Sequence, residues 1–590
     1  MSQERKSLSR RAFLATTAAG IVGLAAGATI GSKAFPEKMT ETITKTITET
    51  RIQTTTQTST ISDVPLHEQV WSFEIPPSIP EKDIIDVLST DILVIGGGIS
   101  GLVATVSAAE EGVSVITLEK GDSPFQYGWW YGVIGSKLHK ERGINIDKNH
   151  VWALLQRAGL FRIDPRLIKM WVDNSGKVMD WLLDIIEDES GIKYDSFPIE
   201  THPEKVHNGE PPKVTIGGIE VLRYFPTAIL LPSNTVVVPS LLKRIEKLKG
   251  KVLFGTAGVQ LLKDGDKVVG AVAKTKDGYI KINSKAVILA TGGYEGNKLM
   301  LRKYIPEADS IVHVLGKPLN TGDGILMAQW VGAAIDPWPH APMLFDWGLY
   351  GTKVPTLENI FRQPWLAVNM FGERFYNEDN IYGYTCKAYF YQPGHFAWVI
   401  WDDKWRDEEI LLRMGGTVCE RTTNKYIDLT TGVFSNEPII FHKEEWVEEL
   451  INKGAIIRAS TIDELASKMG VPIETLKKTI NRYNELAMKG IDEDFGKDPH
   501  KLVAIDKPPY YAAKVGPALL VTLSGVRVTP ELNVLSKDWK VIKGLYAVGN
   551  TCGGFFAYEY PVAVTGDSMG RAITTGYIAA KKAVEYVKSL

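Results

Sequence analysis

A glycine-rich run between two apolar stretches has the spacing of a dinucleotide-binding loop. Gly96, Gly98 and Gly101 stand in a G-x-G-x-x-G pattern directly after the apolar run 91–95. Glycines at this spacing allow a tight turn and let backbone N–H groups approach a pyrophosphate at a helix N-terminus. Glu119 ends the next apolar run, where an acid binds a ribose hydroxyl. The sequence therefore predicts a site for a dinucleotide.

The elements that must position this site can be predicted from the same stretch. Residues 91–95 are typical of a buried parallel strand, residues 102–111 of a helix and residues 113–118 of a second strand. Two later segments, 290–297 and 544–554, also run from an apolar strand into a glycine-rich turn. This succession of elements predicts an α/β fold.

The composition excludes several classes of function. The chain has 590 residues, enough for two or more domains, and its net charge of -2 does not favour nucleic acid or an anionic membrane. The three cysteines, Cys386, Cys419 and Cys552, form no CxxC pair and no CxxCH motif. No metal site, iron–sulfur cluster, disulfide framework or covalent haem is therefore predicted. Any electrons must come from another molecule.

The N-terminus has the pattern of a twin-arginine export signal. Arg10 and Arg11 precede Phe13 and a weakly apolar run rich in alanine and glycine, and small residues offer a cleavage site before residue 35. We expect residues 1–34 to be read by the Tat translocase and the protein to work outside the cytoplasm. A chance arginine pair before an amphipathic helix is the alternative, and an uncleaved anchor stays open.

A threonine-rich segment follows the predicted signal. Residues 40–61 are low in complexity, with nothing bulky to bury. We expect residues 35–88 to form a solvated linker between the signal and the catalytic body.

Several longer segments resemble one flavoprotein family. They are "ATGGYEGN" at 290–297, "TGDGILMAQWVGAA" at 321–334, "VNMFGERFYNED" at 368–379 and "GLYAVGNTCGG" at 544–554. From residue 91 onward, the chain resembles the FAD-binding fumarate reductases and ketosteroid dehydrogenases.

The resemblance implies a fold and a cofactor. It implies a Rossmann-like FAD-binding domain of the glutathione-reductase type, built from residues 89–338 and 515–590, with an inserted α+β capping domain at 339–514. The FAD would be held non-covalently, because the His-Thr pattern of covalent attachment is missing after Glu119. The residues that we expect to bind FAD are Gly96, Gly98, Ser100, Gly101, Glu119, Lys120, Thr291, Gly292, Asp323, Gly549, Asn550, Gly566 and Ser568.

The resemblance also implies catalytic residues. In fumarate reductases, the general acid that donates the proton is an arginine four residues after the Glu of an R-F-x-N-E motif. Here the motif ends at Glu378, and the fourth residue after it is Tyr382, as in ketosteroid dehydrogenases. Tyr382 would donate the proton, Glu358 and Arg362 would resupply it, and Tyr560 would hold a substrate oxygen. The alternatives are a ring lining the cap for Tyr382 and a structural ion pair for Glu358 and Arg362.

The chain departs from fumarate reductases where they bind carboxylates. The histidines and the late arginine of that pattern are missing, and residues 520–525 read "LVTLSG". A dicarboxylate that is buried without such partners is strongly disfavoured. Aromatic segments such as "YGWWYG" and "FDWGLYG" favour a flatter, more apolar substrate, although each ring alone could be packing.

The sequence therefore predicts an exported FAD oxidoreductase. It would reduce the activated C=C bond of an α,β-unsaturated acid or ketone, with electrons from an external donor such as a cytochrome or a quinol-linked protein. One alternative is a ketosteroid-type dehydrogenase that introduces a C=C bond next to a ketone. An alternative of another class is a flavin-binding electron-carrier subunit without a substrate of its own.

Overall fold

The computed structural model of the protein describes residues 65–124, 128–197, 199, 213–216, 219–223, 225–352, 363–414, 426–427, 434–435 and 444–590. The unit that spans Val70–Leu590 contains two large sheets. In the described residues, no helix is both long and apolar enough to cross a membrane.

The first sheet has a parallel core. Its hydrogen-bonded neighbours are, in order, β7 (Lys251–Leu253), β2 (Val115–Leu118), β1 (Ile84–Ile95), β10 (Tyr279–Leu289) and β20 (Val541–Ala547). The antiparallel strands β8 (Ala257–Asp264) and β9 (Lys267–Lys274) extend it through β10, and β19 (Asn533–Leu535) pairs with β20. The parallel core confirms the predicted α/β, Rossmann-like fold.

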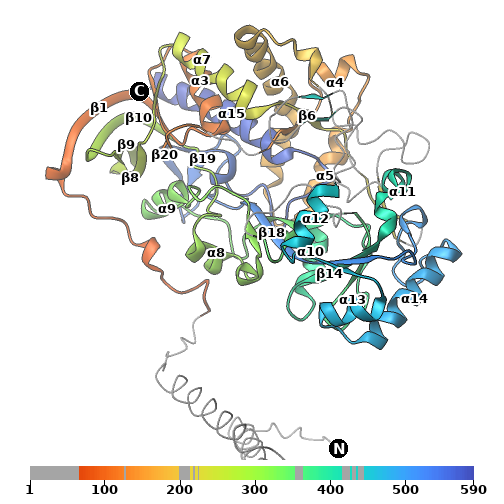
Figure 1. Ribbon diagram of the computed structural model, residues 1–590. Helices are drawn as coiled ribbons and strands as arrows, with labels where there is room; N and C mark the ends of the chain where they lie inside the picture. The colour runs from red at the N-terminus through yellow and green to blue at the C-terminus, as the bar shows by residue number, and fades with distance from the viewer. Residues whose placement is uncertain are drawn as a thin grey trace, which may run out of the picture. The chain divides into compact units, whose positions relative to one another are not determined.

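Helices from both ends of the chain pack on this sheet. They are α3 (Ile99–Ala109) and α15 (Asp567–Lys588), and the helices α6 (Pro165–Ser190) and α7 (Val238–Lys247) pack in turn on α15 and α3; Figure 1 shows all four together. Every residue of α3 is buried, because the helix lies between the sheet, α7 and α15. A Cβ added at Gly576 of α15 would lie 2.3 Å from the carbonyl oxygen of Ser100, so these two helices touch through backbone.

The second sheet is mostly antiparallel. It contains β11 (His313–Val314), β12 (Pro342–Leu349), β13 (Leu366–Val368), β14 (Ala397–Asp402), β17 (Ile456–Ala459) and the long β18 (Tyr510–Thr522). The helices α10 (Tyr382–Phe390), α13 (Ile462–Met469) and α14 (Ile473–Lys489) accompany it. The boundary expected at residues 514 and 515 falls inside β18, which continues to pair with β12 as far as Thr522.

The remaining elements are short or peripheral. The helices are α4 (Lys137–Glu141), α5 (Lys148–Ala158), α8 (Lys298–Tyr304), α9 (Asp323–Trp330), α11 (Glu408–Met414) and α12 (Glu444–Asn452). The strands form three pairs, β3 (Trp130–Gly132) with β6 (Ala228–Leu230), β4 (Lys213–Ile216) with β5 (Ile219–Arg223), and β15 (Tyr426–Ile427) with β16 (Phe434–Ser435).

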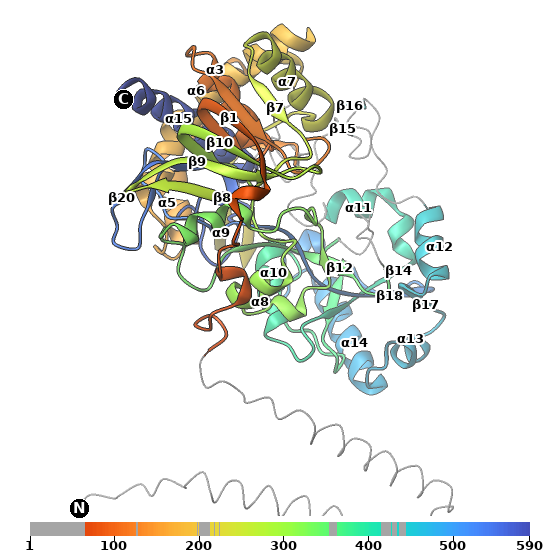
Figure 2. The ribbon, with the colours of Figure 1, turned by 90° about the vertical axis from the view of Figure 1, so that its left-hand side faces the viewer.

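The end of the expected linker is structured. Residues 71–83, which we call the strap, contain two 3-10 helices, Ser72–Glu74 and Glu81–Asp83. Figure 2 shows the strap running from the start of β1 past α9 toward α8. Strand β1 itself begins at Ile84, within the predicted linker.

A buried ion cluster holds the second sheet to α14 and the loop after it. Arg374 donates two hydrogen bonds to Glu378, at 2.8 and 2.7 Å, and two to Asp492, at 3.0 and 2.7 Å. Lys497 lies 3.3 Å from Glu378, and all of these side chains are buried. We read Arg374 and Glu378 as structural residues.

The Arg374→Met variant is therefore expected to destabilise the fold by about 3–5 kcal/mol, because it leaves two buried carboxylates without their main partner. The thermal unfolding midpoint measures this effect. Arg482→Met is the matched control, since Arg482 makes a similar two-bond pair with Asp494 at an exposed position and should change the midpoint little. Equal shifts in the two variants would contradict a structural role for the buried cluster.

Candidate functional site

The predicted dinucleotide loop lies between β1 and α3. Gly96 has a φ of +111°, and a Cβ added there would lie 2.3 Å from the carbonyl oxygen of Ala290. A Cβ on Gly101 would lie 1.9 Å from the carbonyl oxygen of Gly96. In contrast, no described atom lies within 4 Å of a Cβ built on Gly98, the residue that caps α3. The loop thus presents open space at the helix N-terminus, where a pyrophosphate would bind.

Glu119 lies beside this loop, at the end of β2. One carboxylate oxygen accepts a hydrogen bond of 2.9 Å from the backbone N–H of Gly97, and the other accepts one of 2.7 Å from Gly121. A carboxylate has about four acceptor positions, so it can still accept hydroxyl groups of a ribose. The open loop and the anchored acid fit a dinucleotide such as FAD.

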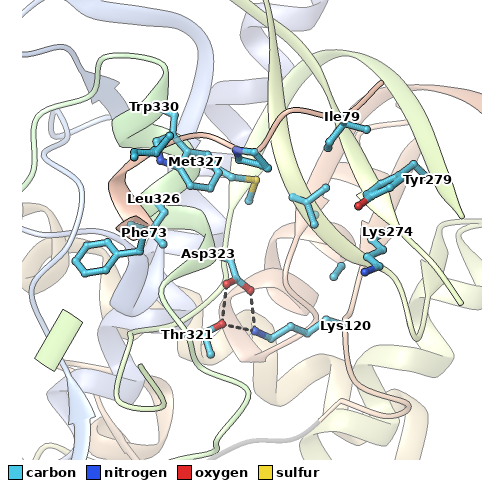
Figure 3. Close-up of a pocket in the computed structure, with 15 residues that line it drawn as sticks. Phe73, Ile79, Lys120, Lys274, Tyr279, Thr321, Asp323, Leu326, Met327 and Trp330 are labelled. Carbon is cyan, nitrogen blue, oxygen red and sulfur yellow. Dashed lines mark hydrogen bonds and ion pairs between the residues drawn. The ribbon is translucent and has the colours of Figure 1, made fainter. Parts of the chain in front are cut away.

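Lys120, Thr321 and Asp323 form a polar cluster next to Glu119. Lys120 donates hydrogen bonds of 2.8 Å to Thr321 and 2.7 Å to Asp323. Figure 3 shows these three side chains at one wall of a cavity of about 570 Å³. Apolar side chains of α9 and of the strap line the cavity as well, among them Leu326, Met327, Trp330, Phe73 and Ile79.

The later glycine-rich turns meet the same loop. Thr291 accepts a hydrogen bond of 3.0 Å from the backbone of Gly324, and its hydroxyl lies 3.3 Å from that of Thr551. A Cβ on Gly549 would lie 2.7 Å from the hydroxyl of Ser100. Thr551 donates a hydrogen bond of 3.1 Å to the carbonyl of Gly292. Cofactor-binding residues predicted from distant segments thus lie side by side.

The start of α15 carries the remaining predicted FAD residues. Gly566 caps the helix with a φ of +76°, and the hydroxyl of Ser568 lies 3.5 Å from the amide oxygen of Asn550. Two residues that the sequence reasoning missed also lie here. Arg571, fully buried, donates to Asn550 and to the carbonyl of Cys552.

Asp567, the other missed residue, is fully buried at the first position of α15. Burial raises the pKa of Asp567 to about 8, while hydrogen bonding to Tyr560 and the charge of Arg571 act in the opposite direction. Tyr560 is thereby linked to the end of the helix that carries Ser568.

Tyr382 is the first residue of α10 and is buried. Its ring packs against Phe345 and Trp347 of β12, with centroid separations of 4.6 and 6.3 Å. A Cβ on the next residue, Gly383, would lie 1.9 Å from a carboxylate oxygen of Glu559. The segment that carries Tyr560 therefore abuts the start of α10. The proposed relay residues, Glu358 and Arg362, lie outside the described residues.

Glu559 is a further residue that the sequence reasoning missed. Its Oε1 atom is buried and has no hydrogen-bond partner among the described residues. Burial raises the pKa of Glu559 from 4.5 to about 8, and the charge of Lys387 lowers it. Burial raises the pKa of Tyr384 and of Cys386, and the charge of this carboxylate adds to both shifts. An acid between two tyrosines in the apolar segment 555–564 was the signal available in the sequence.

This raised pKa predicts how stability depends on pH. Below pH 4.5 the Glu559 carboxyl group is protonated in both the folded and the unfolded protein. Between pH 4.5 and 8 it ionises only in the unfolded protein, so the free energy of unfolding falls as the pH rises through this range. Glu559→Gln cannot ionise. Its stability relative to the natural chain is expected to rise from pH 5 to pH 8.5, by up to about 4 kcal/mol.

Thermal unfolding of both proteins at each pH measures this difference. Glu445→Gln, at an exposed position of α12, is the control and should show no such trend. A constant difference between Glu559→Gln and the natural chain at all pH values would contradict the raised pKa.

Comparisons with known proteins agree with this geometry. Residues 91–562 match the family described as an FAD binding domain. The chain is 27% identical to the vinyl phenol reductase of Lactiplantibacillus plantarum, over 84% of this chain and 97% of that protein. It is 26% identical to a 3-oxosteroid 1-dehydrogenase of Mycobacterium tuberculosis, over 83% and 97% of the two chains.

A solved structure shows the same fold. The open conformation of a flavocytochrome c3 fumarate reductase superposes with a TM-score of 0.61 at 22% identity, over 88% of this chain and 83% of that one. Since the match to the FAD binding domain covers most of the chain, the protein belongs to this family and is an FAD-dependent oxidoreductase.

Proposed function

We propose that the protein reduces a C=C bond conjugated to a carbonyl or to an aromatic ring. The observation that carries this proposal is the buried Tyr382, whose ring packs against Phe345 and Trp347 next to the segment of Tyr560. Aromatic walls suit a flat, apolar substrate better than a dicarboxylate. The similarity to a vinyl phenol reductase and to 3-oxosteroid 1-dehydrogenases supports the same class of substrate.

We propose a division of labour between the cofactor and the residues around it. Bound FAD would supply the hydride to one carbon of the double bond. Tyr382 would donate its hydroxyl proton to the neighbouring carbon, as a phenol with a pKa near 10 can do at neutral pH. Tyr560 would hold the substrate oxygen, with Asp567 behind it. Glu358 and Arg362 are proposed to return a proton to Tyr382.

The residues that would hold FAD are those that meet at the loop after β1. Gly96, Gly98, Ser100 and Gly101 would face the pyrophosphate, and Glu119 the ribose. The remaining proposed contacts come from the other segments gathered there, namely Lys120, Thr291, Gly292, Asp323, Gly549, Asn550, Gly566 and Ser568.

We also propose that the protein acts outside the cytoplasm. The twin arginine at residues 10 and 11 would direct it to the Tat translocase, and a cytochrome or a quinol-linked protein would reduce it. A reductase placed there can use its substrate as a terminal electron acceptor.

The test is an anaerobic reoxidation experiment. The FAD-loaded protein is reduced chemically, and the flavin absorbance is followed while fumarate, urocanate, cinnamate-type acids, vinyl phenols and ketosteroid enones are added. Rapid reoxidation by an aromatic or ketonic acceptor supports the proposal. Rapid reoxidation by fumarate alone would overturn the inferred substrate class. If no acceptor works while a saturated 3-ketosteroid reduces the oxidised protein, the enzyme is a dehydrogenase.

A further inference from the structure

The cavity beside Lys120 is bounded by the strap. Four strap residues, Phe73, Ile75, Pro77 and Ile79, contribute to its lining. The other walls come from all three strands of the β8–β10 meander, through Ala257, Lys274 and Tyr279, and from α9, through Leu326, Met327 and Trp330. Figure 3 shows Phe73 and Ile79 on the strap, with Lys120 and Asp323 at the polar part of the wall.

The position of this cavity relates it to the dinucleotide loop. Glu119 is hydrogen-bonded to the loop through Gly97, and the next residue, Lys120, lines the cavity. The backbone of Thr256 donates a hydrogen bond of 2.9 Å to the carbonyl of Glu119, which places the cavity-lining start of β8 beside the ribose-binding acid. In FAD, the ribose lies between the pyrophosphate and the adenine. If the pyrophosphate of FAD binds at the loop and its ribose at Glu119, the adenine therefore lies toward the cavity.

The strap is fixed to the body of the protein by a shielded ion pair. Lys303 of α8 lies 2.6 Å from Glu74, and the Lys303 side chain is only 6% exposed. The same carboxylate oxygen accepts a hydrogen bond of 2.9 Å from the backbone of Trp71. Phe73, between these two residues, packs against the hydrophobic core. The ion pair thus holds the strap at the position where Phe73 and Ile75 reach the cavity.

We propose that the strap is the outer wall of the adenine site and retains FAD in the enzyme. Its apolar side chains would cover a face of the adenine ring that the meander and α9 leave open to water. The strap forms the last part of the predicted export linker. FAD bound against the strap would therefore also hold this end of the linker on the body of the protein. This inference rests on FAD binding alone and stands or falls independently of the substrate.

The first experiment measures how fast FAD leaves the full-length enzyme. Phe73→Ala removes a wall residue, and Glu74→Gln weakens the anchor without touching the cavity lining. Each is expected to raise the FAD dissociation rate constant about 10- to 100-fold, measured by the recovery of free flavin fluorescence. Val87→Ala is the control, because Val87 is 56% exposed and does not line the cavity. Dissociation at the natural rate in both strap variants would overturn the proposal.

The second experiment locates the adenine. FAD with an azide at C8 of the adenine is bound to the full-length apo-protein, irradiated, and the labelled peptides are identified by mass spectrometry. Labelling of residues 71–79, competed by unmodified FAD, is the expected result. Labelling confined to segments outside the cavity lining would overturn the proposal. Such labelling would overturn the proposal even if Phe73→Ala released FAD faster, because a less stable fold also releases FAD faster.

Discussion

The Tyr382→Phe variant is expected to bind FAD normally and to reduce its substrate about 10²- to 10⁴-fold more slowly. This range is typical for the loss of a positioned general acid. The phenylalanine ring keeps the contacts with Phe345 and Trp347, so the helix start should remain in place. Only the hydroxyl group, and with it the proton, is lost.

A two-step measurement separates these effects. Chemical reduction of the bound flavin should proceed as in the natural enzyme, whereas its reoxidation by the best acceptor should slow. Tyr389→Phe is the matched control on the same helix, because Tyr389 is equally buried and its hydroxyl donates a long hydrogen bond of 3.4 Å to the carbonyl of Asp346. If Tyr382→Phe stays within about threefold of the control, the proton comes from another group.

The first sheet and the FAD loop could be predicted because their signals are local. Residues 91–101 combine an apolar strand, three spaced glycines and a helix, and each feature needs only its neighbours in the sequence. The helix begins at Ile99 rather than at residue 102, since the loop glycines enter its first turn. FAD and the oxidoreductase class followed from the family resemblance and are confirmed by the match over residues 91–562.

The strap could not be predicted in the same way. Residues 71–83 have no periodic apolar pattern and follow a low-complexity segment, so the sequence favoured a linker. Phe73 and Glu74 are ordered by partners more than 200 positions away, such as Lys303. The same limit applies to Glu559. Its contact with Gly383 joins segments that lie far apart in the chain, and no spacing rule connects them.

Two glycines of the loop after β1 are expected to affect the stability of the apo-protein differently when each is replaced by alanine. A Cβ on Gly101 would lie 1.9 Å from the carbonyl oxygen of Gly96, so Gly101→Ala must push the loop and α3 apart. Gly98→Ala meets no described atom within 4 Å, and the φ of −71° suits alanine. The methyl group of Gly98→Ala would instead occupy the open space at the helix N-terminus, where the loop backbone has to approach the pyrophosphate.

Gly98→Ala should therefore leave the thermal midpoint of the apo-protein unchanged and weaken FAD binding about 100-fold or more, a loss of roughly 3 kcal/mol. Gly101→Ala should lower the apo-protein midpoint as well as the affinity. Titration of each apo-protein with FAD, beside thermal unfolding without it, gives both quantities. If Gly98→Ala binds FAD as tightly as the natural chain, the pyrophosphate does not approach this turn. The open space at Gly98 would then need another occupant, because the surrounding glycines hold the turn in shape whether or not a ligand is bound.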